Sequence, residues 1–282
     1  MKHRVGGSHL NHGRTRFAPS PTYYLHLGHA ASAFHVWRAA EEMGGEVLLR
    51  IEDIDTTRCR PEYTAAIYED LAWLGFEWRK PVRVQSQHFD AYEQTVSALT
   101  ERGLTYRCFR TRSELATLSD PTVPGPHDAA DEAERLARGE AFAWRLSLDA
   151  CRETLGSVWQ DLSYQVLSEQ GVESVPACPE IEGDAVIARK DSPSAYHLAA
   201  THDDALQGIT HLIRGEDLID APHIQTLLQV LMSWAQPVYQ HHALILGEDG
   251  AKLSKRDKSL TLAELRADGV TPDQIKQRLG FA

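Results

Sequence analysis

Two histidines separated by a leucine and a glycine stand near the N-terminus of the chain. The motif is His26-Leu27-Gly28-His29, and it lies between a proline-rich loop and an apolar pattern with helical spacing. Backbone N–H groups at a helix N-terminus attract anions, and a glycine there lets a ligand approach the backbone closely. His26, Gly28 and His29 therefore predict a phosphate-binding site. Surface histidines that happen to begin a helix are the alternative interpretation.

A second candidate for phosphate chemistry is the basic run Lys252–Arg256, which follows a turn containing Gly247 and Gly250. It combines three cations with a hydroxyl group. A loop of this kind can close on a polyphosphate and stabilise the charge that grows in a transition state. Lys252 and Lys255 are the candidates for that role. An ordinary solvated charge run is the alternative, because most lysine-rich segments are of that kind.

Charged residues also stand at the ends of predicted strands. Arg16 and Arg214 each end a short apolar segment, and Glu52 directly follows another. In a parallel sheet such positions line the ligand crevice. Guanidinium groups bind carboxylates in a bidentate manner, and a carboxylate can bind an ammonium group. Structural ion pairing is the alternative for each of the three.

These candidates need a scaffold, and the first half of the chain supplies an α/β pattern. Apolar spacing and glycine or proline breaks mark alternating strands and helices. This order is typical of a parallel sheet with crossover helices. The expected strands are 15–18 and 47–51, and the expected helices are 28–43, 61–74 and 89–99.

The pattern changes after Thr105. A loop over 120–126, a charged helix over 129–138 and a period-two strand over 142–148 suggest an inserted unit. The α/β pattern then returns, with strands at 185–188, 209–213 and 242–246, a helix at 221–234, and short helices at 261–267 and 271–279. We therefore predict a disordered tail (1–13), two halves of a catalytic domain (14–104 and 181–246), an inserted subdomain (105–180), and a basic loop with C-terminal helices (247–282).

Composition narrows the function classes. The 282 residues are 42% hydrophobic and 24% charged, which is typical of a globular protein. No apolar run of about 18 residues is present, so no membrane span is predicted. The formal net charge of −11 argues against nucleic-acid binding by bulk charge, although a local basic face remains compatible with it. No secretion signal precedes the first strand, so we expect a cytoplasmic protein.

Taken together, the motifs resemble the catalytic half of class I glutamyl-tRNA synthetases. Five blocks occur in one order: Arg16–Thr22, His26–His29, Arg50–Asp55, Ile213–Asp217 and Lys252–Arg256. The resemblance implies an α/β fold, with a Rossmann-type parallel sheet, an inserted α+β acceptor-binding-like subdomain and a short helical C-terminal segment. The histidine block would be the "HIGH" signature, and the basic run the "KMSKS" loop.

The resemblance also implies residue roles. His26, Gly28, His29 and Lys255 would bind ATP, which brings Mg²⁺, and Lys252 would support Lys255 in stabilising the transition state. Arg16 and Arg214 would hold the carboxylates of L-glutamate, and Glu52 its ammonium group. The complete set expected around glutamate is Arg16, Phe17, Ala18, Pro19, Ser20, Glu52, Tyr196 and Arg214.

The length of the chain favours one branch of this family. Arg256 lies close to the end of the sequence, whereas full glutamyl-tRNA synthetases continue into an anticodon-binding domain. The lack of such a domain in this sequence is similar to the glutamyl-queuosine tRNA(Asp) synthetases, which transfer glutamate to the queuosine base at the wobble position of tRNA(Asp). We expect that tRNA as the partner of a monomeric enzyme. The alternatives are the catalytic half of an ordinary synthetase for tRNA(Glu), and a non-catalytic paralogue that binds glutamate or ATP.

Two departures from the family pattern matter. Tyr23 stands where the family usually has glycine, so a loop that needs positive φ would be strained. In the insertion, Cys108 keeps one expected zinc ligand, but Arg110 replaces the next, and the four cysteines form no CxxC pair. We therefore predict no zinc, and an ion pair of Arg110 that holds the loop instead. Arg107, Arg110 and Arg112 are candidate tRNA contacts, or simply a solvated cluster.

Overall fold

The computed structural model describes residues 13–245 and 260–281. Nearly all of the predicted N-terminal tail lies outside these residues. Lys252 and Lys255 of the basic run also lie outside them. The interpretations given above for these segments therefore stay predictions.

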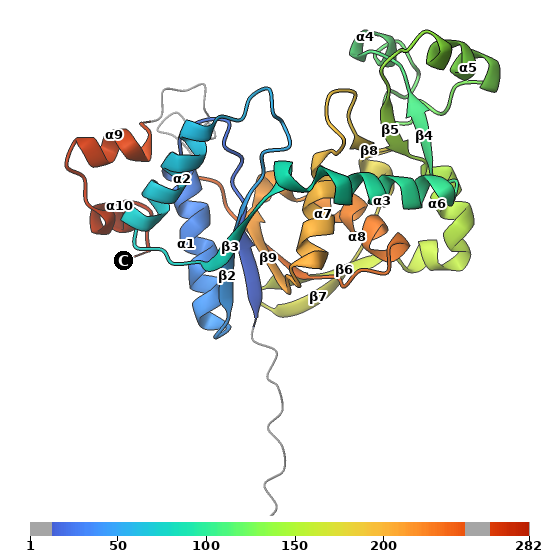
Figure 1. The fold of residues 1–282 in the computed structure, drawn as a ribbon. Helices are drawn as coiled ribbons and strands as arrows, with labels where there is room; N and C mark the ends of the chain where they lie inside the picture. The colour runs from blue at the N-terminus through green and yellow to red at the C-terminus, as the bar shows by residue number, and fades with distance from the viewer. Residues whose placement is uncertain (1–12, 246–259, 282) are drawn as a thin grey trace, which may run out of the picture.

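A twisted sheet of parallel strands forms the centre of the molecule (Figure 1). Strands β1, β2 and β3 form one parallel sheet in that order, and β7-β6-β10-β9 form another, in which only β7 is antiparallel to its neighbour. The two sheets meet where β1 lies beside β9. There the Thr210 amide donates to the Arg14 carbonyl, and the Arg14 amide to Thr210 Oγ1, each at 2.8 Å. The strands are β1 (Arg14–Phe17), β2 (Glu46–Ile51), β3 (Arg79–Val84), β6 (Ser163–Ser168), β7 (Gly171–Pro176), β9 (His211–Gly215) and β10 (Val238–His242).

The combined order β3-β2-β1-β9-β10-β6 is that of a doubly wound Rossmann fold. In such a fold the chain reverses its winding direction between the two central strands, and ligands bind outside their carboxyl ends. Here those strands are β1 and β9. The topology therefore places the ligand crevice at Phe17 and Gly215, the last residues of the two strands.

A separate antiparallel sheet, β4-β5-β8, lies at one end of the molecule (upper right in Figure 1). It consists of β4 (Thr105–Cys108), β5 (Ala143–Leu146) and β8 (Val186–Ala188), and it carries α4 (Arg112–Leu115) and α5 (Ala129–Ala137). This arrangement differs from the predicted insertion at 105–180. Strand β8 comes after residue 180 but completes this sheet, whereas β6 and β7 come before it but join β10.

The remaining helices cover the central sheet and build two hydrophobic clusters. In the first, Leu49 and Ile51 of β2 pack with Ile67 of α2, and the C-terminal helices close the cluster through Leu262 and Ile275. In the second, α3, α7 and α8 pack together around residues such as Tyr92. These helices are α1 (Leu27–Glu42), α2 (Pro61–Trp73), α3 (Phe89–Glu101), α6 (Leu148–Leu155), α7 (Tyr196–Leu206), α8 (Ala221–Leu231), α9 (Leu262–Ala267) and α10 (Pro272–Arg278).

One predicted strand is wrong. The sequence suggests a strand over 242–246, but β10 ends at His242, and residues 243–245 have no regular structure. The reason is the register with β9, which pairs Val238 with His211 and His242 with Gly215. Both strands therefore end together at the crevice, and the apolar residues after His242 are left to line it.

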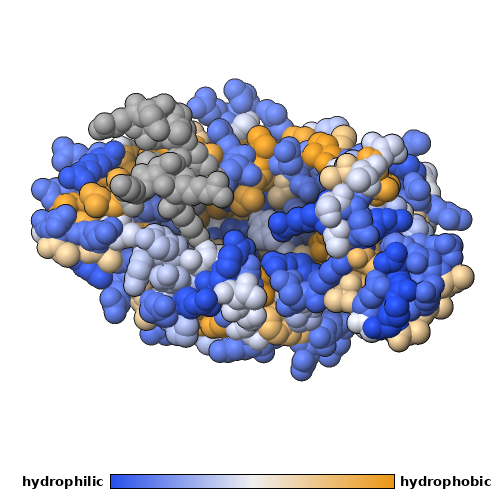
Figure 2. Space-filling view, turned by 90° about the horizontal axis from the view of Figure 1, so that it is seen from above, coloured by the Kyte–Doolittle hydropathy of each residue, from blue (hydrophilic) through white to orange (hydrophobic). Residues whose placement is uncertain are grey.

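The outer surface is hydrophilic over most of the face in Figure 2, with hydrophobic residues in small separate patches. Within the described part of the chain, no helix is long and apolar enough to cross a membrane.

Candidate active site

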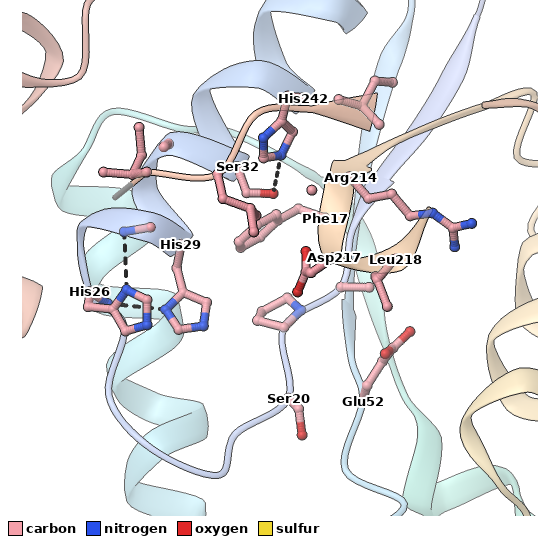
Figure 3. Close-up of a pocket in the computed structure, with 18 of the residues that line it drawn as sticks. Phe17, Ser20, His26, His29, Ser32, Glu52, Arg214, Asp217, Leu218 and His242 are labelled. Carbon is pink, nitrogen blue, oxygen red and sulfur yellow. Dashed lines mark hydrogen bonds between the residues drawn. The ribbon is translucent and has the colours of Figure 1, made fainter. Parts of the chain in front are cut away.

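A pocket of about 520 Å³ lies at the carboxyl ends of β1 and β9 (Figure 3). Its walls come from the loop after β1, the start of α1, the end of β2, the first residue of α7, and the loops after β9 and β10. Every predicted site residue that the structure describes lines this pocket: Arg16, Phe17, Ala18, Pro19, Ser20, His26, Gly28, His29, Glu52, Tyr196 and Arg214.

The two histidines begin α1 and hydrogen-bond to its backbone. His26 is the N-cap residue, and its Nδ1 accepts from the Gly28 amide at 3.1 Å, while His29 Nδ1 accepts from the His26 amide at 3.2 Å. The two rings lie side by side, with centroids 4.0 Å apart (Figure 3). An imidazole whose Nδ1 accepts a hydrogen bond carries its proton on Nε2 when it is neutral. Both rings thus carry an Nε2–H group beside a helix N-terminus, a position suited to phosphate oxygens.

Gly28 is the residue that allows this arrangement. A Cβ atom at this position would lie 3.0 Å from His26 Cε1 and 3.1 Å from its Nδ1. Either contact would require the ring to shift by a few tenths of an ångström. The glycine in the motif is therefore explained by close packing against the first histidine.

Arg214 is buried at the opposite wall, where β9 ends. Its Nε donates to His241 Nε2 at 3.3 Å and its Nη1 to Gln225 Oε1 at 3.1 Å, and its guanidinium lies over the Tyr239 ring. Its Nη2 is buried and has no hydrogen-bond partner within residues 13–245 and 260–281. A buried guanidinium nitrogen without an acceptor is costly. A ligand carboxylate that reached this nitrogen would remove that cost.

A buried network joins the other two charged residues of the site. Asp204 of α7 accepts from Arg50 Nη1 at 2.8 Å and from Arg16 Nε at 3.3 Å. Arg50 is fully buried and also donates from Nη2 to Glu52 Oε1 at 3.1 Å. Arg16 and Glu52 thus lie on opposite sides of one Arg50–Asp204 pair, which fixes both of them.

The charge state of Glu52 depends on this network. Burial raises the pKa of its carboxyl group above the usual value, and the guanidinium groups of Arg50 and Arg16 counteract part of that rise. A carboxylate in this position favours a cationic ligand group, because an ammonium would offset the same burial cost.

Helix α7 supplies the last wall of the pocket. Tyr196 is its first residue and lines the pocket. Burial raises the pKa of the Tyr196 hydroxyl, which therefore stays protonated and can donate a hydrogen bond. Since Asp204 stands further along the same helix, α7 both contacts the ligand space and holds Arg16.

Sequence reasoning missed several pocket residues. Ser32, one turn after His29, has its hydroxyl 3.2 Å from His242 Nε2 at the end of β10. Asp217 and Leu218 line the pocket from the loop after β9. A Cβ atom at Gly215 would lie 2.5 Å from Asp217 Oδ1, so a side chain there would force Asp217 to shift. Helical spacing from His29 is the only signal that points to Ser32.

The two departures from the family pattern have plain structural accounts. Ser233 is the only described residue other than glycine with a positive φ, so Tyr23 occupies an ordinary backbone conformation, and the expected strain is not found. Arg110 makes no ion pair within the described residues; instead its Nη1 donates to the Gly125 carbonyl at 2.9 Å. That hydrogen bond still ties the chain just after β4 to the 120–126 loop.

The candidate tRNA contacts and zinc ligands of the insertion are otherwise unremarkable. Arg107 pairs with Glu132 at 2.6 Å and lies over the Trp144 ring, whereas Arg112 begins α4 with its side chain exposed. Among the residues that the structure describes, no group of three or more histidine, cysteine or acidic side chains is arranged to hold a metal ion.

A Rossmann-type sheet whose switch point holds a His-x-Gly-His helix start defines the catalytic domain of a class I aminoacyl-tRNA synthetase. Comparison with known families agrees: the family described as tRNA synthetases class I (E and Q), catalytic domain, matches residues 13–280. The chain belongs to this family of ligases.

Within the family, the chain is 38% identical to a glutamyl-Q tRNA(Asp) synthetase of Rhodobacter capsulatus, over 95% of this chain and 99% of that protein. It is 37% identical to a glutamate–tRNA ligase of Nostoc punctiforme, over 93% of this chain but 56% of that protein. A glutamate tRNA ligase from Elizabethkingia meningosepticum, solved with its amino acid, has a TM-score of 0.69 at 28% identity, covering 88% of this chain and 52% of that one. The chain thus spans about half the length of these two ligases.

Proposed function

We propose that this enzyme activates L-glutamate with ATP and transfers the glutamyl group to the queuosine base at the wobble position of tRNA(Asp). The observation that carries the glutamate part is the buried Arg214 with its unpartnered Nη2, which lies in the same pocket as Arg16 and Glu52. The likeness to the Rhodobacter capsulatus protein over 99% of its length supports the tRNA part.

The polarity of the pocket suits an α-amino acid with an acidic side chain. Arg16 and Arg214 would each take a carboxylate, and Glu52 would hold the ammonium group, while the Tyr196 hydroxyl could donate to a carboxylate oxygen. Glutamine would leave one arginine charge without its counterion in a buried site. A site built in this way rejects the neutral analogue strongly.

In the first step, a glutamate carboxylate oxygen would attack the α-phosphorus of ATP, and pyrophosphate would leave with the bonding electron pair. The two Nε2–H groups of His26 and His29 would hold the phosphates at the start of α1. ATP would bring its own Mg²⁺, and zinc remains predicted to be absent.

The basic loop would complete the phosphate site. The basic run belongs to segment 246–259. Ile245, just before this segment, lines the pocket, and Thr261, just after it, forms a β-bridge with His26. The chain therefore enters and leaves this segment beside the phosphate donors. On this basis we assign Lys255, with support from Lys252, to stabilise charge in the transition state.

A second candidate function is esterification of tRNA(Glu), since the glutamate–tRNA ligase of Nostoc punctiforme is 37% identical to the matched part of this chain. The distinguishing experiment offers labelled glutamate and ATP with three RNAs: queuosine-containing tRNA(Asp), unmodified tRNA(Asp) and tRNA(Glu). We expect label on the first alone. Label on tRNA(Glu) would establish the second candidate, and no pyrophosphate exchange with any RNA would refute both.

A further inference from the structure

Three tyrosines form a cluster beside the pocket that the proposed reaction does not use. Tyr23 and Tyr24 stand in the loop between β1 and α1, and Tyr63 stands in the first turns of α2. The ring centroids are 5.6 Å apart for Tyr23 and Tyr24, 4.9 Å for Tyr24 and Tyr63, and 5.8 Å for Tyr23 and Tyr63. We propose that this tyrosine cluster is a stacking surface for an unpaired nucleobase of the RNA substrate, next to the base that enters the pocket.

The position of the cluster is the first argument. The loop that carries Tyr23 and Tyr24 borders the pocket at both ends, because Ser20 before these tyrosines and His26 after them both line the pocket. The same loop is joined to the chain before α2, where the Arg60 amide donates to the Pro21 carbonyl at 3.0 Å. An RNA loop with one base in the pocket could therefore place a neighbouring base on this cluster.

The exposure of the cluster is the second argument. Tyr23 is 42% exposed and is among the large apolar or aromatic side chains most open to solvent, although two other rings lie against it. Tyr24 and Tyr63 are partly exposed. Edge-to-face packing leaves part of a ring face available, and an exposed aromatic face stacks on any base. If the rings served only to pack the loop onto α2, they would all be buried. That role does not explain why Tyr23 is exposed.

Local charge is the third argument. The chain is acidic overall, so RNA can be attracted only by local cations. Two arginines, Arg58 and Arg60, are exposed in the segment that leads into α2. Arg58 pairs with Asp55 but keeps 71% of its side chain exposed. Aromatic rings combined with arginines are the usual surface for single-stranded RNA, in which bases are free to stack.

This inference rests on the proposed function, because it needs an RNA substrate, and its test separates the two. The assay measures binding of a fluorescent anticodon stem–loop of tRNA(Asp) to the full chain, and in parallel the glutamate-dependent pyrophosphate exchange at saturating RNA. We expect Tyr23→Ala to weaken RNA binding roughly five- to hundredfold, the range for loss of one base–aromatic stack. Exchange should be unchanged, and Tyr23→Trp should restore binding.

A matched control is Trp159→Ala. Trp159 is a partly exposed aromatic residue below an arginine, Arg152, but it packs against the second hydrophobic cluster, which contributes no residue to the stacking surface. We expect it to leave RNA binding unchanged. RNA binding by Tyr23→Ala within twofold of the wild type would overturn the proposal. An equal fall of exchange and RNA binding would also overturn it, because the cluster would then only shape the loop. Absence of exchange in the wild type would refute the proposed function instead, and the binding result would still decide the inference.

Discussion

Replacing Asp204 with asparagine tests whether the buried Arg50–Asp204 pair sets the geometry of the pocket. Asparagine has the same shape and can keep a carbonyl oxygen where Asp204 Oδ1 accepts from both guanidinium groups, but it removes the negative charge that neutralises them. Loss of one partner of a buried ion pair costs about 3–5 kcal/mol. Arg50 would keep Glu52 at 3.1 Å and Asp203 at 4.0 Å, so we expect the lower end, about 3 kcal/mol. For a chain of this size that lowers the unfolding midpoint by roughly 5 °C.

The substitution should also change substrate binding, because Arg16 loses the carboxylate 3.3 Å from its Nε. We expect the KM for glutamate to rise about tenfold, which corresponds to about 1.4 kcal/mol, while the KM for ATP stays within twofold. The assays are thermal unfolding and pyrophosphate exchange at varied glutamate, carried out below the new unfolding midpoint.

The matched control is Asp184→Asn. Asp184 is equally buried, and it accepts from the Tyr106 hydroxyl at 2.7 Å and from the Leu148 amide at 2.9 Å, away from the pocket. It should lower stability but leave the KM for glutamate unchanged. If Asp204→Asn unfolds within 2 °C of the wild type, or if both variants raise the KM equally, the reasoning about the network is wrong.

Further predictions concern single features of the site. Arg214→Met should weaken glutamate binding by at least a hundredfold and lower the stability by about 1–3 kcal/mol, because the buried Gln225 Oε1 loses its donor; calorimetric glutamate titration and a melting curve would check this. Gly28→Ala should weaken ATP more than glutamate, since its Cβ would displace the His26 ring; exchange kinetics at varied ATP would show it. Stability should fall as the pH drops from 6.5 toward 4, because burial lowers the pKa of His197 to about 4 in the folded protein, so the unfolded chain binds the proton more readily over this range. Melting curves should show that His197→Gln reduces the dependence of stability on pH. Metal analysis of the purified protein should find no stoichiometric zinc, and a bound zinc ion would contradict the interpretation of Cys108.

The parts of the site that the sequence predicts are those fixed by local rules. Arg16, Arg214 and Glu52 are found because each ends or follows an apolar strand, and strand ends in this fold meet at the crevice. Gly28 is found because glycine at a helix start has few other reasons to be there. Such signals are local in sequence, so they can be recognised without any knowledge of tertiary contacts.

The residues that sequence reasoning misses depend on distant partners. The sequence pattern does not predict α7, because Asp203 and Asp204 lie on its buried face and break the apolar periodicity. They are buried because arginines from other elements neutralise them, among them Arg50, which lies 154 positions from Asp204. The predicted end of β10 is wrong for a related reason. Pairing with β9 sets where the strand ends, and the polar residues His241 and His242 at that end do not look like part of a buried strand.

The junction between β1 and β9 has a consequence for biosynthesis. Arg14 and Thr210 are 196 positions apart, so a ribosome exposes β1 long before its neighbour on that side exists. Until then, one edge of β1 is an unpaired strand edge, which is prone to wrong pairing, and contacts of such long range slow folding. The two walls of the pocket are assembled only when this edge closes. Until then no complete pocket exists in which a ligand could stabilise the nascent chain, and we expect newly made chains to need protection from aggregation until residue 215 has emerged.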